Sequence, residues 1–186
     1  TAILAGDALV TLSFKMISAS TEIDDPAIRL ALVTQLSDAA GAQGMVGGQI
    51  LDIEGEGKQL SLAELEEIHV NKTGRLLSFS VLAGAELARA SEEQKEKLRK
   101  FAHHIGLAFQ IRDDILDLEG TEEELGKPVG SDTGNDKNTY PLLLSLEGSK
   151  EALKGHINQA KQTLVTTGLN TFYLEKITDL IGLRNS

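Results

Sequence analysis

Nine residues in the second half of the chain guide the interpretation of the others: Phe109-Gln110-Ile111-Arg112-Asp113-Asp114-Ile115-Leu116-Asp117. On a helical wheel at about 100° per residue, Asp117 lies about 40° from Asp113, and Asp114 lies about 100° from it. Gln110 and Gly106 fall on the same side, at about 60° and about 20°. The apolar residues lie opposite. The pattern predicts a helix with a narrow acidic face, where a glycine leaves space beside the carboxylates.

Three carboxylates this close repel one another and favour a bound cation. Carboxylate oxygens suit Mg²⁺, which binds through one or two carboxylates together with substrate phosphates and waters. The nine residues contain no histidine or cysteine that would favour zinc. An EF-hand calcium loop does not fit, because Gly120 at its glycine position would put Ile115 at the first ligand position. A solvated helix face is the other interpretation, since this spacing of aspartates also arises by chance.

The composition narrows the classes of function further. Hydrophobic residues make up 41% and charged residues 25% of the 186 residues, and the net charge is −10. Such a charge disfavours a nucleic-acid partner, but not a small anionic substrate beside lysines or a metal. The chain has no cysteine, which excludes disulfides and thiolate sites and fits a reducing cytoplasm. No apolar run approaches the roughly 20 residues of a membrane span, so we expect a cytoplasmic protein without membrane insertion.

Helical spacing of apolar residues runs through almost the whole sequence. Asp25 before Pro26 is typical of a helix start, and Ser61 and Ser91 each begin a capping box. The expected structure is therefore all-α, in a single domain over residues 1–186. The predicted helices cover 2–20, 26–51, 61–89, 91–118, 139–146, 150–167 and 171–183, with a loop over 119–138.

Four glycines fall inside the predicted helix 26–51: Gly41, Gly44, Gly47 and Gly48. Each costs up to about 1 kcal/mol relative to alanine in a helix interior. The glycines therefore indicate either a broken helix or a place where a neighbouring helix or ligand comes very close. The spacing alone does not decide between the two.

Lysines form a second group of candidate site residues. Lys72 and Thr73 interrupt an otherwise apolar helix, and an inward-facing lysine needs a partner such as a diphosphate. Lys127 and Lys137 flank a glycine-containing loop that could close over phosphates. The alternatives are a lysine that snorkels to the surface and an ordinary solvated loop.

Taken in order, these elements resemble the trans-prenyl diphosphate synthases, and among them the bacterial farnesyl diphosphate synthases. The resemblance covers essentially the whole chain, and its stretches are specific as a series rather than singly. The matching stretches are Ile3–Leu9, Gly47–Asp52, His69–Gly74, Gly106–Asp117, Leu125–Lys127 and Lys137–Pro141.

The resemblance implies an isoprenoid-synthase helical bundle around a central cavity, which joins isopentenyl diphosphate to an allylic diphosphate with Mg²⁺. It assigns metal binding to Asp113 and Asp117, with Asp114 in support. The residues that would bind substrate are Lys72, Thr73, Gln110, Lys127 and Lys137. It also implies a homodimer.

The first aspartate-rich motif of these enzymes would lie upstream of Ile3. We therefore expect a chain truncated at its N-terminus, inactive alone, whose parent protein makes farnesyl diphosphate. Three alternatives remain: a terpene cyclase, which Lys72 and Lys137 disfavour; a non-catalytic partner subunit of the same fold; and a plain helical bundle without diphosphate binding.

Overall fold

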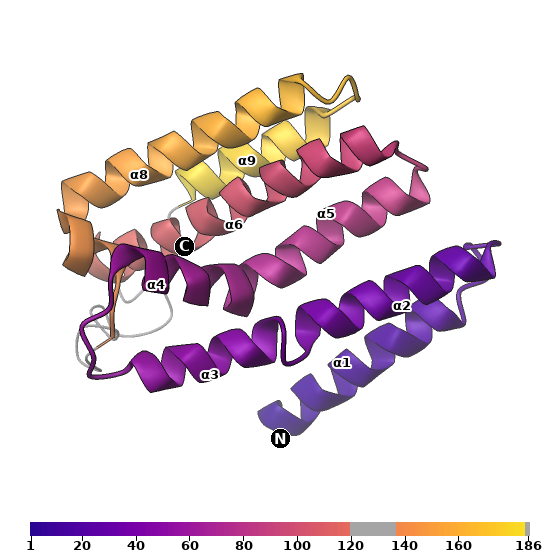
Figure 1. Cartoon of the computed structure of the whole chain (residues 1–186), viewed down its shortest axis with the longest axis horizontal. Coiled ribbons are helices and arrows are strands. Elements are labelled where there is room, and N and C mark those ends of the chain that lie inside the picture. The colour runs from indigo at the N-terminus through magenta and orange to yellow at the C-terminus, as the bar shows by residue number, and fades with distance from the viewer. Residues whose placement is uncertain (120–136, 185–186) are drawn as a thin grey trace.

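The computed structural model describes residues 1–119 and 137–184, and no strand occurs in these two ranges. The all-α prediction is confirmed: long helices pack side by side as a bundle (Figure 1). The helices are α1 (Ala2–Ser18), α2 (Pro26–Ala40), α3 (Met45–Gly55), α4 (Leu62–His69), the π-helical turn η1 (Val70–Gly74), α5 (Arg75–Leu87), α6 (Glu92–Glu119), α8 (Tyr140–Val165) and α9 (Phe172–Leu183).

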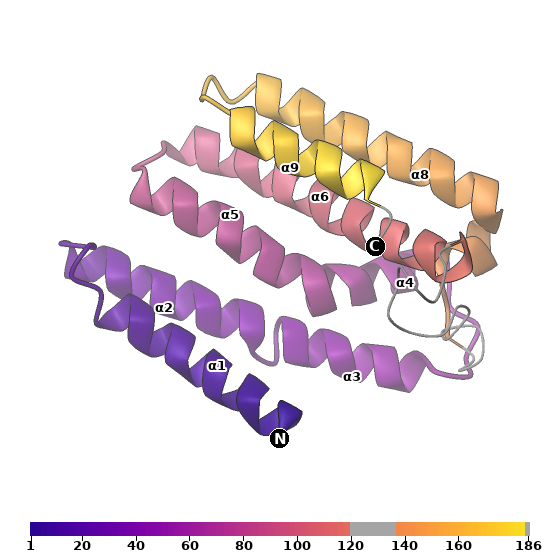
Figure 2. The ribbon, with the colours of Figure 1, turned by 180° about the vertical axis from the view of Figure 1, so that it is seen from behind.

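Helix α6 lies at the centre of the hydrophobic core, between α5 on one side and α8 and α9 on the other (Figures 1 and 2). Its apolar face is fully covered, because Phe101, Ile105, Ile111 and Ile115 are each at most 3% exposed. Burying each such side chain contributes about 1.5–3 kcal/mol. This burial fixes the rotation of α6, and with it the direction of the acidic motif.

The predicted helix starts are confirmed. The Asp25 side chain accepts a hydrogen bond from the backbone N–H of Ala27 at 2.9 Å, with proline at the first helical position. Ser61 forms both bonds of a capping box with Glu64. The corresponding pair of bonds before α6 joins Ser91 and Gln94, at 2.9 and 3.2 Å. Local side-chain chemistry therefore determines where these helices begin.

The prediction of one helix over 26–51 is wrong, because the chain breaks into α2 and α3 at Gly41–Gly44. A Cβ atom on Gly44 would lie 2.1 Å from the carbonyl oxygen of Ala39, so this connection requires glycine. Gly48 has a different role. A Cβ atom there would lie 2.1 Å from the backbone nitrogen of Lys72, so α3 touches the backbone of η1. The glycines serve both purposes that the sequence left open.

The predicted helix 61–89 is continuous, but it contains the π-helical turn η1 in its middle. Such a turn holds one more residue than an α-helical turn and is frequent at functional sites. Gly74 ends this turn and faces Gly106 of α6, where a Cβ atom would lie 3.2 Å from the Cα atom of Gly74. The two glycines bring η1 close to the helix that carries the acidic motif.

The two short helices predicted over 139–146 and 150–167 form one element, α8, with a sharp kink at Ser145 (φ 69°). Thr139 caps its first turn by accepting a hydrogen bond from Leu142 N. Most of the predicted loop 119–138 falls outside the described residues. Among the described helices, none is long and apolar enough to cross a membrane.

Candidate active site

Asp113 is the most accessible carboxylate of the acidic motif, with 43% of its side chain exposed. The guanidinium of Arg184, just after α9, contacts its Oδ1 atom. The same guanidinium donates to the carbonyl of Phe109 at 3.0 Å and lies 4.1 Å from the centre of the Phe109 ring. A cation thus rests beside Asp113, where the sequence predicts that a metal binds.

Arg112 holds the backbone of Arg184 in place. Its Nε and Nη2 atoms donate to the carbonyl oxygen of Arg184 at 2.8 and 2.5 Å. Arg184 was not among the predicted site residues, because nothing in its local sequence indicates a contact with Asp113, 71 residues earlier. The contact depends on how α9 packs along α6.

Asp114 and Asp117 are buried, at 7% and 2% exposure, unlike Asp113. Asp114 points toward the start of α8. Its Oδ2 atom accepts a hydrogen bond from the backbone N–H of Tyr140 at 2.9 Å and lies 3.7 Å from Nε2 of His69. Gln110 is half-buried one turn before Asp113 and Asp114. The three carboxylates therefore have different surroundings despite their spacing.

The donor set suits Mg²⁺ in kind, since it consists of carboxylate oxygens with Asp113 open to solvent. Within residues 1–119 and 137–184, no three His, Cys, Asp or Glu side chains are grouped closely enough to hold a metal ion. Mg²⁺ commonly keeps waters and binds through one or two carboxylates plus substrate phosphates. A site of this kind is completed by its substrate, and Asp113 fits it as a protein ligand.

Lys72 faces Asp52 of α3, and its Nζ atom lies 2.5 Å from the Oδ2 atom of that carboxylate. Both side chains are partly exposed, at 32% and 21%. Thr73, the next residue, is half-buried in the same π-helical turn. The partner that the structure shows for Lys72 is therefore a carboxylate, and its contact with a diphosphate stays a prediction.

Asn138 fastens the segment before α8 to the connection between α3 and α4. Its amide nitrogen donates to the carbonyls of Gly55 and Lys58 at 3.2 and 2.9 Å, and its oxygen accepts from Leu60 N at 3.2 Å. Lys137 and Asn138 line one small pocket together with Asp52. The structure thus brings Lys137 to the same place as the Lys72–Asp52 pair, whereas Lys127 lies outside the described residues.

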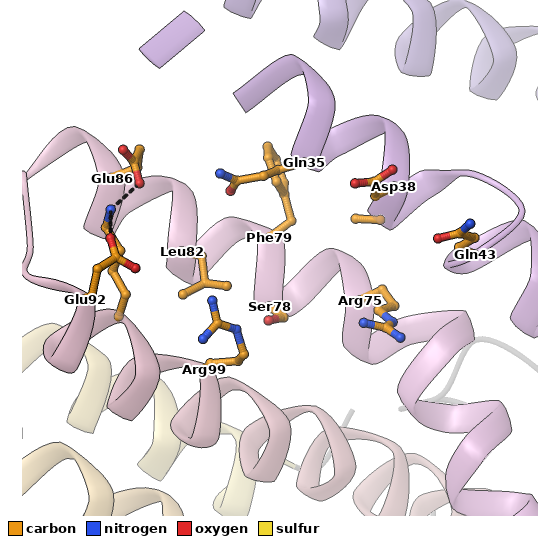
Figure 3. Close-up of a pocket in the computed structure, with 12 residues that line it drawn as sticks. Gln35, Asp38, Gln43, Arg75, Ser78, Phe79, Leu82, Glu86, Glu92 and Arg99 are labelled. Carbon is orange, nitrogen blue, oxygen red and sulfur yellow. Dashed lines mark hydrogen bonds and ion pairs between the residues drawn. The ribbon is translucent and has the colours of Figure 1, made fainter. Parts of the chain in front are cut away.

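A larger pocket of about 550 Å³ lies between α2, α5 and α6 (Figure 3). Its lining is mostly polar, and it includes Arg75, Arg99 and the ion pair of Lys95 with Glu86 at 2.5 Å. Arg99 lies on the same face of α6 as Asp113. The two residues are about 21 Å apart along the helix axis, at a rise of about 1.5 Å per residue. The described lining residues include none of the predicted site residues.

Comparison with known proteins agrees with this fold and motif series. A family model described as polyprenyl synthetase matches residues 1–167. The chain therefore belongs to the polyprenyl synthetase family.

Among individual relatives, the chain is 55% identical to the farnesyl diphosphate synthase of Bacillus subtilis, over 100% of this chain and 63% of the relative. It is 42% identical to the farnesyl diphosphate synthase of Escherichia coli, over 99% of this chain and 63% of that protein. The family resemblance seen in the sequence is confirmed. The chain spans about 63% of the length of these relatives.

Solved structures give the same result. A geranyltransferase from Helicobacter pylori, complexed with magnesium and isoprenyl diphosphate, matches 97% of this chain and 58% of its own with a TM-score of 0.83 and 31% identity. A farnesyl-diphosphate synthase described as putative, from Marinomonas sp. MED121, matches 98% of this chain and 62% of its own with a TM-score of 0.81 and 38% identity. The bundle is therefore a partial prenyltransferase fold.

Proposed function

We propose that the protein containing this chain is a cytoplasmic prenyltransferase, which joins dimethylallyl or geranyl diphosphate to isopentenyl diphosphate and makes farnesyl diphosphate. The observation that carries the proposal is a chain of contacts: Asp114 of the acidic helix bonds to Tyr140, close to Lys137, and Lys137 shares a pocket with Asp52, the partner of Lys72. Asp113 lies on α6, Lys72 on η1 and Lys137 before α8. The identity to named farnesyl diphosphate synthases supports the substrate class.

In this proposal Asp113 and Asp117, which lie one turn apart on α6, would hold Mg²⁺. When bound, the ion supplies positive charge that stabilises the diphosphate leaving group. Lys72, Lys127 and Lys137 bind the same diphosphate oxygens and lower the cost of separating charge as the carbon–oxygen bond breaks.

Thr73 and Gln110 line the allylic site. The allylic cation is attacked by the double bond of isopentenyl diphosphate, and the proton lost from the new product passes to an oxygen of the released diphosphate. No protein side chain is needed as a general base for this step.

The Lys72–Asp52 pair prepares the site for an anion. Asp52 orients Lys72 before substrate arrives, at a partly exposed position where ion pairs are worth at most about 1 kcal/mol. A diphosphate carries more charge than one carboxylate and can draw Lys72 toward itself at little cost.

Calorimetry with geranyl diphosphate, with and without Mg²⁺, tests this site directly in the full-length gene product. We expect binding that depends on Mg²⁺ and that weakens at least about tenfold in Asp113→Asn, because a charge-assisted contact is lost. A plain helical bundle would give no Mg²⁺-dependent heat. The exposed Lys154→Ala serves as a control on α8.

The non-catalytic partner subunit remains the alternative function. Asp113, Asp114 and Asp117 are all present, although an interaction subunit has no need of them. Product analysis of the full-length gene product separates the two, because a partner subunit would form no farnesyl diphosphate by itself.

A further inference from the structure

The five residues before and at the start of α8, Lys137–Pro141, are held by hydrogen bonds from three other elements. We infer that Asp114 is a positioning residue: it fixes this segment through the backbone N–H of Tyr140 and thereby sets where Lys137 enters the site. The part of this inference that concerns Lys137 rests on the proposed function.

The first observation is the direction of Asp114. Its Oδ2 atom is 2.9 Å from Tyr140 N, and the residue is only 7% exposed. Because α8 begins at Tyr140, the carboxylate lies at the N-terminus of a helix, where a negative charge is favourable. Turning Asp114 outward to a hydrated ion would leave a buried N–H without its partner.

The second observation is the burial of Tyr140 itself, which is 1% exposed. Its hydroxyl donates to Oε1 of Glu66 at 3.0 Å, and its ring is nearly parallel to that of His69, with centroids 5.8 Å apart. Burial, with Glu66 and Asp114 nearby, raises the pKa of Tyr140, so the hydroxyl stays a donor. Tyr140 is therefore tied to α4 by its side chain and to α6 by its backbone.

The third observation is Asn138, which makes three hydrogen bonds to the backbone of Gly55, Lys58 and Leu60. With Asn138 and Tyr140 both held, the backbone of Lys137 has little freedom. Lys137 shares a pocket with Asp52, the partner of Lys72. Asp114 thus acts on the segment that carries Lys137, whereas its neighbour Asp113 is partly exposed and contacts Arg184.

The two adjacent aspartates, Asp113 and Asp114, therefore have different roles. Asp113 is partly exposed and paired with Arg184, and Asp114 is buried and bonded to the backbone.

Amide hydrogen exchange and calorimetry with inorganic diphosphate and Mn²⁺, both on the full-length gene product, test the inference. In Asp114→Ala, we expect exchange of the Tyr140 amide to accelerate at least about tenfold, since a bond to a charged acceptor is lost. Diphosphate binding should weaken by a similar factor. Asp114→Asn keeps a carbonyl acceptor at the same place and should restore most of the protection and of the binding.

Three further variants separate positioning from direct contact. Lys137→Ala should weaken diphosphate binding while the Tyr140 amide stays protected. Asn138→Ala should weaken both, with Asp114 intact, and this variant keeps the inference testable if Asp114→Ala does not fold. Asp113→Asn should reduce Mn²⁺ affinity and leave the Tyr140 amide protected.

The inference is overturned if Asp114→Ala leaves the exchange of Tyr140 unchanged, or if Asp114→Asn loses Mn²⁺ as completely as Asp113→Asn does. The exchange measurement needs no substrate. If no variant and no wild-type protein binds diphosphate, the proposed function fails, while the exchange data still decide whether Asp114 fixes the segment.

Discussion

At the scale of single residues, the contact between Asp113 and Arg184 bears directly on metal binding. Arg184 brings a positive charge to the open carboxylate of the acidic motif, and its guanidinium also covers the ring of Phe109. A cation that binds Asp113 must therefore share the carboxylate with Arg184 or displace it. This makes the last described residue of the chain relevant to metal binding.

We predict that Arg184→Ala raises the affinity for Mn²⁺, because a competing cation is removed from Asp113. The same change should lower the melting temperature by a few degrees, since a partly exposed ion pair contributes at most about 1 kcal/mol. Manganese titration followed by electron paramagnetic resonance, together with calorimetric melting, measures the two effects. Lys154→Ala, on an exposed part of α8, should change neither. A lower Mn²⁺ affinity in Arg184→Ala would contradict the prediction.

Gly48 gives a second test at the same scale. Gly48→Ala places a Cβ atom 2.1 Å from Lys72 N, so α3 must move away from η1. We expect a loss of more than about 2 kcal/mol in the free energy of unfolding, as for other forced overpacking.

The matched control is Gly155→Ala in α8, where a Cβ atom meets nothing within 4 Å. There we expect a gain of about 0.5–1 kcal/mol, because alanine favours a helix more than glycine does. Urea unfolding of both variants gives the comparison. Equal stability of the two variants would show that α3 and η1 are not in close contact.

At the scale of the elements, the sequence was sufficient for features that depend on a few neighbouring residues. The starts of α2, α4 and α6 follow from Asp25, Ser61 and Ser91, whose side chains bond within their own first turn. The break at Gly41–Gly44 was only one of two alternatives left open by the sequence, and the π-helical turn η1 was not predicted. A helical wheel assumes one regular helix, so it shows neither a break nor an extra residue in a turn.

The candidate site divides in the same way. The spacing of the three aspartates along one helix could be predicted, whereas the direction of Lys72 was left open. The inward direction of Asp114 and the contact of Arg184 could not, since each depends on a partner at least 26 residues away in the sequence. The roles of Thr73, Gln110 and Asp117 remain predictions, and Lys127 lies outside the described residues.

The contact between α6 and α8 contains a histidine pair that should make stability depend on pH. Nδ1 of His104 lies 3.1 Å from Nδ1 of His156, so one ring donates an N–H and the other, a neutral ring, accepts it. Burial lowers the pKa of both, and the charge of His156 lowers that of His104 further. Each ring is therefore harder to protonate in the folded state than at its ordinary pKa of 6.5.

Because the folded pKa values are lowered, the unfolded chain takes up more protons as the pH falls below about 6.5. The contribution of the pair to stability is thus complete above that pH and is lost toward the folded pKa values. We expect the melting temperature to fall between pH 7.5 and 5.5, and to fall less in His104→Gln/His156→Gln. The same pH dependence in both proteins would remove the pair as its cause.

At the scale of the whole molecule, α1 is the least covered element. It has no buried residue and packs only along the edge of the bundle, against α2, in both views (Figures 1 and 2). Ile3 and Leu4 are 82% and 72% exposed, and Leu9 and Met16 are also open. An apolar face of this kind is expected to be covered by further protein.

Two kinds of protein could cover this face. One is a further part of a longer chain, since the relatives are longer than this one, and the other is the second copy in the homodimer that the resemblance implies. We predict that the isolated 186-residue chain self-associates. Sedimentation velocity at rising concentration measures this, and Leu4→Lys/Met16→Lys should reduce it. A monomer at every concentration would contradict the prediction.

The central proposal is that Asp113, Lys72 and Lys137 belong to a prenyl-transfer site of a protein longer than this 186-residue chain. The most direct measurement is the formation of farnesyl diphosphate from geranyl and isopentenyl diphosphates with Mg²⁺, by the full-length gene product and by the isolated chain. We predict product from the full-length protein, loss of product in its Asp113→Asn variant, and none from the isolated chain. Comparable turnover by the isolated chain, or no product from the full-length protein, would contradict the account.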